Sequence, residues 1–386
     1  MAFDNLKKTQ PRLALELEEN YKKNLLPQSI LFTGERGSSR LTAALDLAFL
    51  LTGENRDTLR TQSIIYFPHR ELLQRLKSSV EMFINSRTQK SKLFLIETLR
   101  IINMQYNSQL IAYSPSSISS LFKIADNIDV YLTDLEDKTE ITDDDIAELK
   151  ALIKANHLLD DARYLYSGKK TPSSVTIDQL RGIKEWMTTT SGRRVVIIED
   201  IESTTENAKN SILKMLEEPL EDFTIILISS QSQRIMETIL SRVRKFNFPP
   251  LSKETISSLI RDRFNDYNSY SSFETFFFKV GNNQKTVDEC EEAIATFVDS
   301  ISSSKEIPLD KEEEITALLD KLGGYTYFRG RVVEEIERRL FSSNISPLKC
   351  KRLLDILSKY SENIEVYNMS DRLGFDLIER ECEVVK

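Results

Sequence analysis

The chain of 386 residues is poor in the residues that build metal centres and disulfide frameworks. Its three cysteines, Cys290, Cys350 and Cys382, are odd in number and far apart, which argues against a disulfide framework and against a zinc site of paired cysteines. Because His69 and His157 are the only histidines, a histidine-rich metal centre cannot be built either. We therefore expect no metal site and a reducing, cytoplasmic environment.

Long apolar runs and an excess of positive charge are also missing. No stretch approaches the roughly 20 apolar residues that a membrane span requires, and Met1 to Gln10 contains no apolar signal core. The 52 lysines and arginines are outnumbered by 60 aspartates and glutamates, which gives a formal charge of −8. This balance excludes a generally basic protein that coats nucleic-acid phosphates, although a local basic patch could still contact a phosphate backbone.

Five short apolar runs have the character of buried strands. Hydrophobic residues make up 40% of the chain, and its length suggests two or three domains at roughly 150 residues each. Segments with helical spacing, such as Leu41 to Leu51 and Val175 to Met187, separate the runs. This alternation predicts an α/β fold whose parallel sheet is covered on both faces. The predicted strands are Ser29 to Thr33, Ser63 to Phe67, Val195 to Ile198, Phe223 to Ile228 and Lys245 to Phe248.

Between the second and third strands, about residues 71 to 170 have little glycine or proline and contain amphipathic stretches such as Leu93 to Met104. We interpret them as a helical insertion. Within it, Thr142 precedes three aspartates, a pattern typical of an N-cap with acidic residues in the first helical turn. The acidic run therefore predicts the start of a solvated helix rather than a metal site.

After Pro249-Pro250 every strong signal is helical. Ser252 is expected to cap a helix that ends at Phe264, and the serines at 302 to 304 are the best linker candidate. The sequence thus predicts an α/β core over residues 1–248, a small helical domain over residues 249–302 and a C-terminal helical domain over residues 303–386.

The loop after the first strand stands where a phosphate-binding loop should be. In the pattern GxxxxGK[ST] the second glycine lets the backbone wrap the phosphates, the lysine reaches their oxygens and the hydroxyl binds magnesium. Gly34 keeps the first position and Gly37 lies inside the loop. Ser39 replaces the second glycine, Arg40 the lysine and Leu41 the hydroxyl. Arg40 could hold an anion at the helix N-terminus, or the loop could serve only as a turn in which Arg40 pairs with an acidic neighbour.

The third strand ends in Glu199-Asp200, at the edge of a parallel sheet where ligands bind. In an active ATPase the first acid, usually Asp, helps to hold magnesium and the second, usually Glu, polarises the attacking water. Here the order is reversed. Further on, Ser241-Arg242-Val243 precedes the fifth strand and follows a helix expected to begin near Arg234. Arg242 suits an arginine finger, because guanidinium is always charged and binds two oxygens at once, but alone it could equally be an ordinary surface residue.

Taken together, these landmarks resemble those of bacterial DNA polymerase III clamp-loader subunits of the delta-prime and gamma/tau type, which are AAA+ proteins. The resemblance covers about residues 4–67 and 172–290. It is carried by the strand ending in paired acids, the helix closing in Leu216-Glu217-Glu218-Pro219, the strand ending in Ser229-Ser230, the Ser241-Arg242-Val243 motif, and the segments Thr176 to Arg181 and Leu26 to Gly34.

The resemblance implies roles for two of these residues. Arg242 falls on the arginine that acts in trans on the ATP of an adjacent subunit, and Ser230 falls near the first sensor position. It also implies that the ATP-Mg is bound by a neighbouring subunit, with no cofactor of this chain's own. The implied partners are gamma/tau and delta types of subunit in a hetero-pentamer, and, through that complex, the sliding clamp and primer-template DNA.

Several departures from the family bear on which subunit this is. The second sensor arginine expected shortly after Gly281 is missing, with Gln284 or Lys285 in its vicinity. The four-cysteine zinc module is absent, and the helical insertion is not a feature of the family. Loss of the loop lysine and hydroxyl fits delta-prime better than gamma/tau, because delta-prime subunits are commonly the non-hydrolysing member of the ring.

The sequence therefore predicts a non-hydrolysing delta-prime-like stator with an AAA+ core, a helical lid over residues 249–302 and a helical collar over residues 303–386. Two alternatives remain open. One is a gamma/tau-like subunit or weak ATPase, in which Arg40 replaces the lysine and Glu199 or Asp200 holds the metal. The other is an interaction adaptor that keeps the AAA+ shape without serving a replication ring.

Overall fold

The computed structural model describes residues 3–55, 61, 63–67, 72–104, 118–159, 175, 177–189, 192–220, 222–303, 308–322, 325–342, 345–366, 377–378 and 380–381. The chain folds as two units, Met1–Phe273 and Glu274–Lys386. The finer division into core, lid and collar remains a prediction. None of the described helices is long and apolar enough to cross a bilayer.

The first unit contains a five-stranded sheet in the order β2-β3-β4-β1-β5, and every neighbouring pair is parallel. All five predicted strands are confirmed, each end within one residue of the expected position. The strands are β1 (Ser29–Gly34), β2 (Ile64–Phe67), β3 (Arg194–Ile198), β4 (Phe223–Ser229) and β5 (Arg244–Phe248). The near-continuous apolar runs therefore correspond to a sheet buried on both faces, and the predicted α/β class is confirmed.

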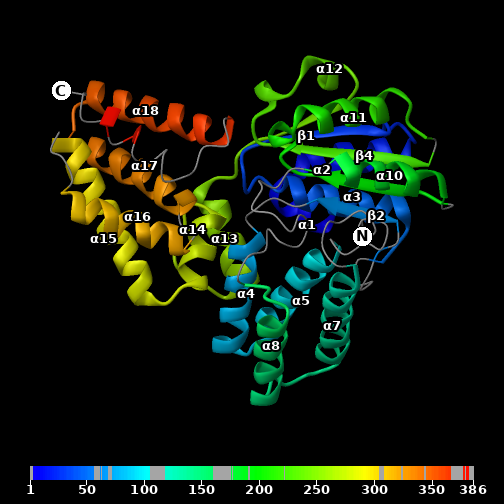
Figure 1. The fold of residues 1–386 in the computed structure, drawn as a ribbon, viewed down its shortest axis with the longest axis horizontal. Helices are drawn as coiled ribbons and strands as arrows, with labels where there is room; N and C mark the ends of the chain where they lie inside the picture. The colour runs from blue at the N-terminus through cyan, green and yellow to red at the C-terminus, as the bar shows by residue number, and fades with distance from the viewer. Residues whose placement is uncertain are drawn as a thin grey trace. The chain divides into compact units, whose positions relative to one another are not determined.

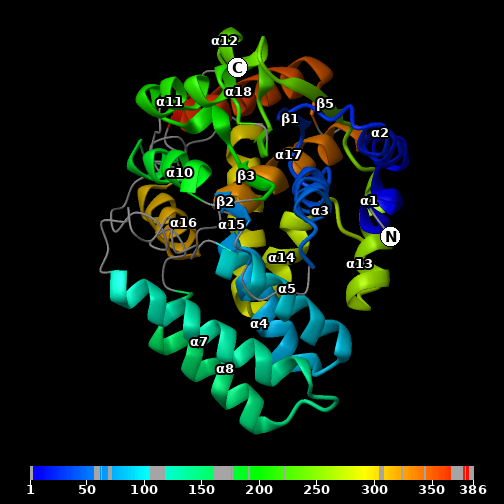
Figure 2. The ribbon, with the colours of Figure 1, turned by 90° about the vertical axis from the view of Figure 1, so that its right-hand side faces the viewer.

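Alternate residues of the strands supply two apolar layers. Ile30 and Phe32 of β1 lie in the cluster that contains α3 (Arg40–Thr52), whereas Leu31 lies in the cluster that contains α10 (Ile177–Thr189) and α11 (Glu206–Glu217). Figure 2 shows the sheet between α3 on one side and α10 and α11 on the other. Side chains on a strand alternate between the two faces, so each face carries its own core.

The chain begins with α1 (Asp4–Thr9) and α2 (Pro11–Lys22), and α1 contacts α3. Proline at the first position of α2 is compatible with the helix, because the amide proton it lacks would have no partner within the helix. Gln10, between the two helices, is 6% exposed. The segment that joins α1 to α2 is thus packed into the first unit.

The predicted insertion is helical in its described part, which comprises α4 (Leu72–Ser86), α5 (Gln89–Asn103), α7 (Ile118–Glu136) and α8 (Asp143–Ala155) (Figure 1). Its apolar side chains belong to the same cluster as the α3 face of the sheet, so the insertion extends that core. Thr142 caps α8 as predicted, and its hydroxyl accepts from the amide of Asp145. No group of metal ligands is found among the described residues.

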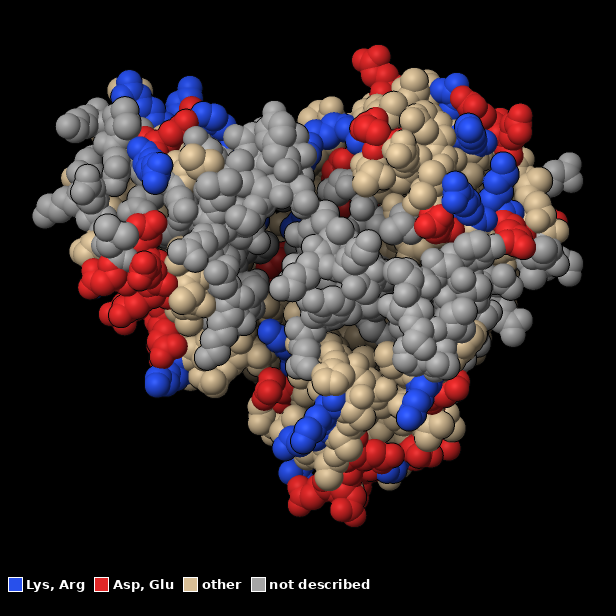
Figure 3. All heavy atoms as spheres, in the orientation of Figure 1, with Lys and Arg blue, Asp and Glu red and all other residues tan. Residues whose placement is uncertain are grey.

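The turn between α7 and α8 is acidic and exposed. It carries Asp137 and Glu140, the first turn of α8 adds Asp143 and Asp144, and Figure 3 shows acidic side chains gathered at this lower end of the unit. Asp143 pairs with Arg87 at 2.6 Å. A cluster of this sign repels a phosphate backbone at this turn.

The insertion also contacts α13 (Lys253–Phe264), the first helix after the sheet. The rings of Phe94 in α5 and Phe264 in α13 lie 4.7 Å apart, edge to face. Arg263 pairs with Glu97, and Lys90 donates to the carbonyl oxygen of Asp262 at 2.8 Å. Apolar and charged contacts therefore join the insertion to the helix that follows the sheet.

Two short elements follow β4, namely the 3-10 turn η3 (Ser232–Arg234) and α12 (Glu237–Leu240). The helix expected to begin near Arg234 therefore begins at Glu237. Ile235, between the two elements, has extended backbone angles and is 5% exposed. Its side chain packs in the apolar cluster of the α10 and α11 face, which separates the 3-10 turn from the helix.

The second unit is helical throughout its described part. It comprises α14 (Phe273–Gly281, except its first residue), α15 (Gln284–Ser303), α16 (Leu309–Leu322), α17 (Tyr325–Phe341) and α18 (Pro347–Val366). Cys290 and Cys350 are buried in its core, whereas Cys382 lies outside the described residues. Ser302 and Ser303 are helical, so the predicted linker is wrong at these two positions. The hydroxyl of Ser303 donates to the carbonyl oxygen of Asp299 at 2.6 Å, a bond that serine commonly makes within helices.

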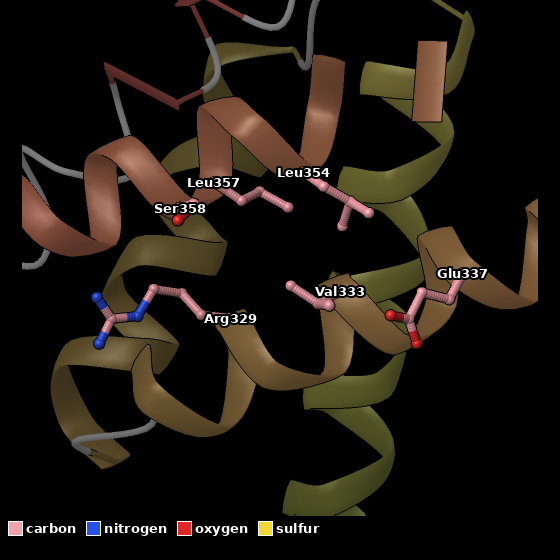
Figure 4. Close-up of a pocket in the computed structure, with 6 residues that line it drawn as sticks. All are labelled: Arg329, Val333, Glu337, Leu354, Leu357 and Ser358. Atoms are coloured by element: carbon pink, nitrogen blue, oxygen red, sulfur yellow. The ribbon is translucent and has the colours of Figure 1, made fainter. Parts of the chain in front are cut away.

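A groove of about 410 Å³ lies between α17 and α18. Figure 4 shows Leu354 and Leu357 of α18 pointing toward α17, where Val333 lies. Arg329, Glu337 and Ser358 complete the lining. None of the residues predicted from the sequence to form a site lies in this groove.

Candidate functional site

The predicted loop, acidic pair and sensor-like serine gather at one edge of the sheet. They follow β1, β3 and β4, which are adjacent and parallel, so their carboxyl ends meet. The register pairs Thr33 with Ser229 and Ile198 with Leu227, which places the ends of the three strands side by side. This is the edge at which α/β proteins bind ligands.

The loop between β1 and α3 has unusual backbone geometry at three positions. A Cβ atom on Gly34 would lie 2.3 Å from the carbonyl oxygen of Phe248, so only glycine fits there. Gly37 has φ of 75°, and Ser39 has φ of 72° although it carries a side chain. Ser39 thus adopts the left-handed conformation that the missing second glycine would adopt without strain.

The next two residues open α3, and both are turned toward the protein. Arg40 is the first residue of α3 and is only 8% exposed. Leu41 packs against the apolar cluster on the α3 face of the sheet. In the phosphate-binding pattern this position carries the hydroxyl that binds magnesium, whereas Leu41 makes an apolar contact here.

Gln10 joins the loop to the end of β5, a contact that the sequence did not predict. Its side-chain nitrogen donates to the carbonyl oxygen of Ser38 at 3.2 Å and to that of Pro249 at 2.7 Å. Gln10 and Pro249 are 239 positions apart in the chain, so no local pattern signals this contact. The buried amide ties the loop to two distant segments.

In the acidic pair, Glu199 is bonded to a residue of the neighbouring strand. The hydroxyl of Tyr66, in β2, donates to Oε2 of Glu199 at 2.6 Å. Asp200 has φ of 49° and precedes the 3-10 turn η2 (Ile201–Ser203). The register of β2 and β3 pairs Tyr66 with Ile197, which brings its ring beside the end of β3. The sequence did not predict this contact, and its only signal was a tyrosine in a strand adjacent to β3.

Ser230 is likewise engaged within the chain. Oε1 of Glu202 accepts from the amide of Ser230 at 3.0 Å, from its hydroxyl at 3.1 Å and from the amide of Gln231 at 3.2 Å. Glu202 is 7% exposed. Its carboxylate therefore accepts hydrogen bonds from the amide and hydroxyl donors of the loop that follows β4. A third acid shortly after Glu199-Asp200 was the signal in the sequence that could have identified this residue.

Arg242 lies at the opposite edge of the sheet. It comes two residues before β5, and the first residue of that strand, Arg244, is in register with Ile30 near the start of β1. The phosphate loop follows the other end of β1. Arg242 therefore belongs to the amino-terminal edge, whereas Gly34 and Ser230 belong to the carboxyl-terminal edge. Among the sequence-predicted site residues, the structure brings the loop, acids and sensor together and separates Arg242 from them.

A five-stranded parallel sheet with an apolar core on each face places the first unit in the α/β class, and the loops after β1, β3 and β4 lie at the carboxyl ends of its strands. Residues 9–252 match the sequence profile of a family described as "DNA polymerase III, delta subunit". The chain belongs to this family.

Individual relatives match shorter segments. Subunit delta' of DNA polymerase III from Bacillus subtilis is 37% identical over 86 residues, which is 22% of this chain and 26% of that protein. The delta' subunit from Pseudomonas aeruginosa is 35% identical over 82 residues, 20% of this chain and 25% of that protein. Replication factor C subunit 4 from Arabidopsis thaliana is 33% identical over 67 residues, 17% of this chain and 20% of that protein. The matches thus span about a quarter or less of the length of these curated relatives.

A solved structure of a DNA polymerase III gamma subunit-related protein from Thermotoga maritima was also found. Its sequence is 18% identical, the match covers 55% of this chain and 80% of that one, and the TM-score is 0.29.

Proposed function

We propose that this chain is a non-hydrolysing, delta-prime-like subunit of the DNA polymerase III clamp loader in the cytoplasm. It acts as a stator in a hetero-pentamer with subunits of the gamma/tau and delta types. It presents Arg242 as an arginine finger to ATP-Mg bound by a neighbouring subunit. That contact couples the neighbour's nucleotide to loading of the sliding clamp on primer-template DNA.

The observation that carries this proposal is the separation of Arg242 from the chain's own phosphate loop. Arg242 precedes β5 at the amino-terminal edge of the sheet, and Gly34 ends β1 at the other edge. A nucleotide that Arg242 reaches would therefore be bound by a different chain. Its side chain is 36% exposed, which leaves the guanidinium accessible to a partner.

The residues of the loop do not fit magnesium triphosphate. Such a site needs a hydroxyl after the loop's cationic residue and an acidic side chain to hold the metal. Leu41 packs on the core instead of offering a hydroxyl, and Glu199 accepts from Tyr66. These contacts support a loop that keeps its shape without binding a nucleotide, and they argue against the form of the weak-ATPase alternative in which Glu199 holds the metal.

The loop after β4 also supports a subunit that does not respond to a nucleotide of its own. In a working switch, polar groups at this position sense the terminal phosphate. Here Glu202 already accepts from both the amide and the hydroxyl of Ser230. Because an internal carboxylate takes the place of an external anion, this edge of the sheet is suited to a fixed shape rather than to a nucleotide-dependent change.

The proposal is tested with Arg242→Ala in a loader assembled from this chain and its own partner subunits. ATP turnover is measured with sliding clamp and primed DNA present. We expect turnover to fall by at least about tenfold, since an arginine finger contributes a large part of transition-state stabilisation. Unchanged turnover and unchanged clamp loading would contradict the trans-acting role and favour the adaptor alternative.

A further inference from the structure

Arg242 is held in place by groups of its own chain. Its Nη2 lies 2.9 Å from Oε1 of Glu217, and its Nη1 donates to the carbonyl oxygen of Thr238 at 2.7 Å. Nη1 also lies 3.2 Å from the hydroxyl oxygen of Ser241. Both terminal nitrogens of the guanidinium are thus engaged, and among the described residues none accepts from Nε.

The two partners stand on elements that pack together. Glu217 is the last residue of α11, and Arg242 follows α12 by two positions. These helices contact each other, and Leu216 and Ile239 are buried in the same apolar cluster at 5% and 1% exposure. The backbone on both sides of the ion pair is therefore packed in the core. The carboxylate of Glu217 thus has a fixed position against which the long side chain of Arg242 can be ordered.

The ion pair itself contributes little to folding. The side chains of Arg242 and Glu217 are 36% and 47% exposed, and such pairs are screened by water and salt. What the pair does is restrict the conformations of the arginine, which otherwise must be ordered when it binds an anion. An arginine ordered in advance loses less freedom when it meets a phosphate.

We infer that Glu217 is the positioning residue of Arg242. It holds Nη2 beside α11 while Thr238 holds Nη1, and the Nε–H remains available to an anionic group on another molecule. This inference rests on the proposed function, because it assumes that the anion is the terminal phosphate of a nucleotide bound by a neighbouring subunit.

The test compares Glu217→Ala with Glu218→Ala in the assembled loader. Both variants remove one exposed carboxylate at the end of α11, but no ion pair of Glu218 is found among the described residues. We expect Glu217→Ala to lower kcat for ATP roughly tenfold with KM for ATP unchanged, since misplacing a catalytic group affects the transition state. Glu218→Ala keeps the wild-type kcat, and the melting temperature of all variants stays close to that of the wild type.

Two further variants separate positioning from a merely structural role. Glu217→Gln keeps an oxygen beside Nη2 but removes its charge, so it retains part of the kcat that Glu217→Ala loses. In the Arg242→Ala background, Glu217→Ala has no additional effect, because the two residues act as one unit. A multiplicative loss in the double variant would overturn the inference.

Failure of the inference and failure of the proposed function give different results. If Arg242→Ala lowers kcat but Glu217→Ala leaves it unchanged or raises it, Glu217 does not position the arginine and the proposed function stands. If Arg242→Ala itself has no effect, the proposed function fails and the inference fails with it.

Discussion

Tyr66 and Glu199 are bonded across neighbouring parallel strands, with 2.6 Å between the phenol oxygen and Oε2 of the carboxylate. The tyrosine is 1% exposed, so its hydroxyl hydrogen-bonds to this carboxylate instead of to water. In a working ATPase the first acid after this strand helps to hold magnesium. Here the carboxylate of Glu199 accepts a hydrogen bond from the neighbouring strand β2.

We expect Tyr66→Phe to destabilise the chain without creating an enzyme. Removing a hydrogen bond to a carboxylate costs about 1.5 kcal/mol. Urea unfolding should show this loss, and the proposed function predicts no ATP turnover in this variant, because Leu41 still supplies no hydroxyl. Magnesium-dependent turnover in this variant would mean that the tyrosine, rather than the loop, blocks hydrolysis.

A second prediction concerns Gly34. Gly34→Ala would place a Cβ atom 2.3 Å from the carbonyl oxygen of Phe248, and a backbone atom of a central sheet cannot move aside cheaply. We expect the variant to lose about 2 kcal/mol or more in urea unfolding. Gly330→Ala is the matched control, because a Cβ there meets nothing within 4 Å and the position is an exposed helix interior, so a gain of about 0.5–1 kcal/mol is expected. Equal effects of the two changes would contradict this reading of the loop.

The contact between the insertion and α13 gives a third prediction. Phe94 is 2% exposed and its ring meets that of Phe264. Phe94→Ala removes this packing and should lower the protection of α13 against hydrogen exchange by an amount equivalent to about 3 kcal/mol. The adjacent Leu93 is 57% exposed on the same helix, so Leu93→Ala should leave α13 unchanged. If both variants loosen α13 equally, the aromatic contact does not hold this helix.

Acid should weaken the second unit through its paired carboxylates. A hydrogen bond from Arg338 lowers the pKa of Glu335 from 4.5 to about 2, although burial acts in the opposite direction. Burial alone would raise the pKa of Glu291, but hydrogen bonds from Arg331 and Tyr327 outweigh it and lower that pKa. Because these pKa values are lower in the folded state, both carboxylates stabilise the folded state above about pH 4.5. The stabilisation from Glu335 is lost as the pH falls toward 2.

Thermal unfolding from pH 7 to pH 2 checks whether the pKa of Glu335 is lowered in the folded state. The wild type should be more stable than Glu335→Gln at neutral pH, and the difference should disappear between about pH 4.5 and 2. Glu313→Gln, an exposed carboxylate of α16, serves as the control for loss of charge. A difference that grows as the pH falls would contradict the direction of the pKa shift.

The sheet could be predicted from the sequence because its signals are local. Each strand is a short apolar run bounded by polar or turn residues, and helices with apolar stripes separate them. The N-caps Thr142 and Ser252 were predicted for the same reason, since an N-cap is read within three or four residues. Ser302 and Ser303 were predicted wrongly, because serines within a helix can bond to the preceding turn and do not always mark a linker.

The contacts that define the site could not be predicted, because they join distant parts of the chain. Tyr66 and Glu199 are 133 positions apart, and Gln10 and Pro249 are 239 apart. They meet only after the register of the strands is set. Glu217 was visible in the segment Leu216-Glu217-Glu218-Pro219, but the fold alone shows which of its two glutamates faces Arg242.

The central claim is that the chain keeps the shape of a nucleotide switch while acting on nucleotide bound elsewhere. Titration calorimetry of ATP into the purified chain, with and without magnesium, tests it most directly. We expect magnesium to add no affinity, because Leu41 offers no hydroxyl to a metal and Glu199 is bonded to Tyr66. Tight binding that appears only with magnesium, and that Arg40→Ala abolishes, would contradict it.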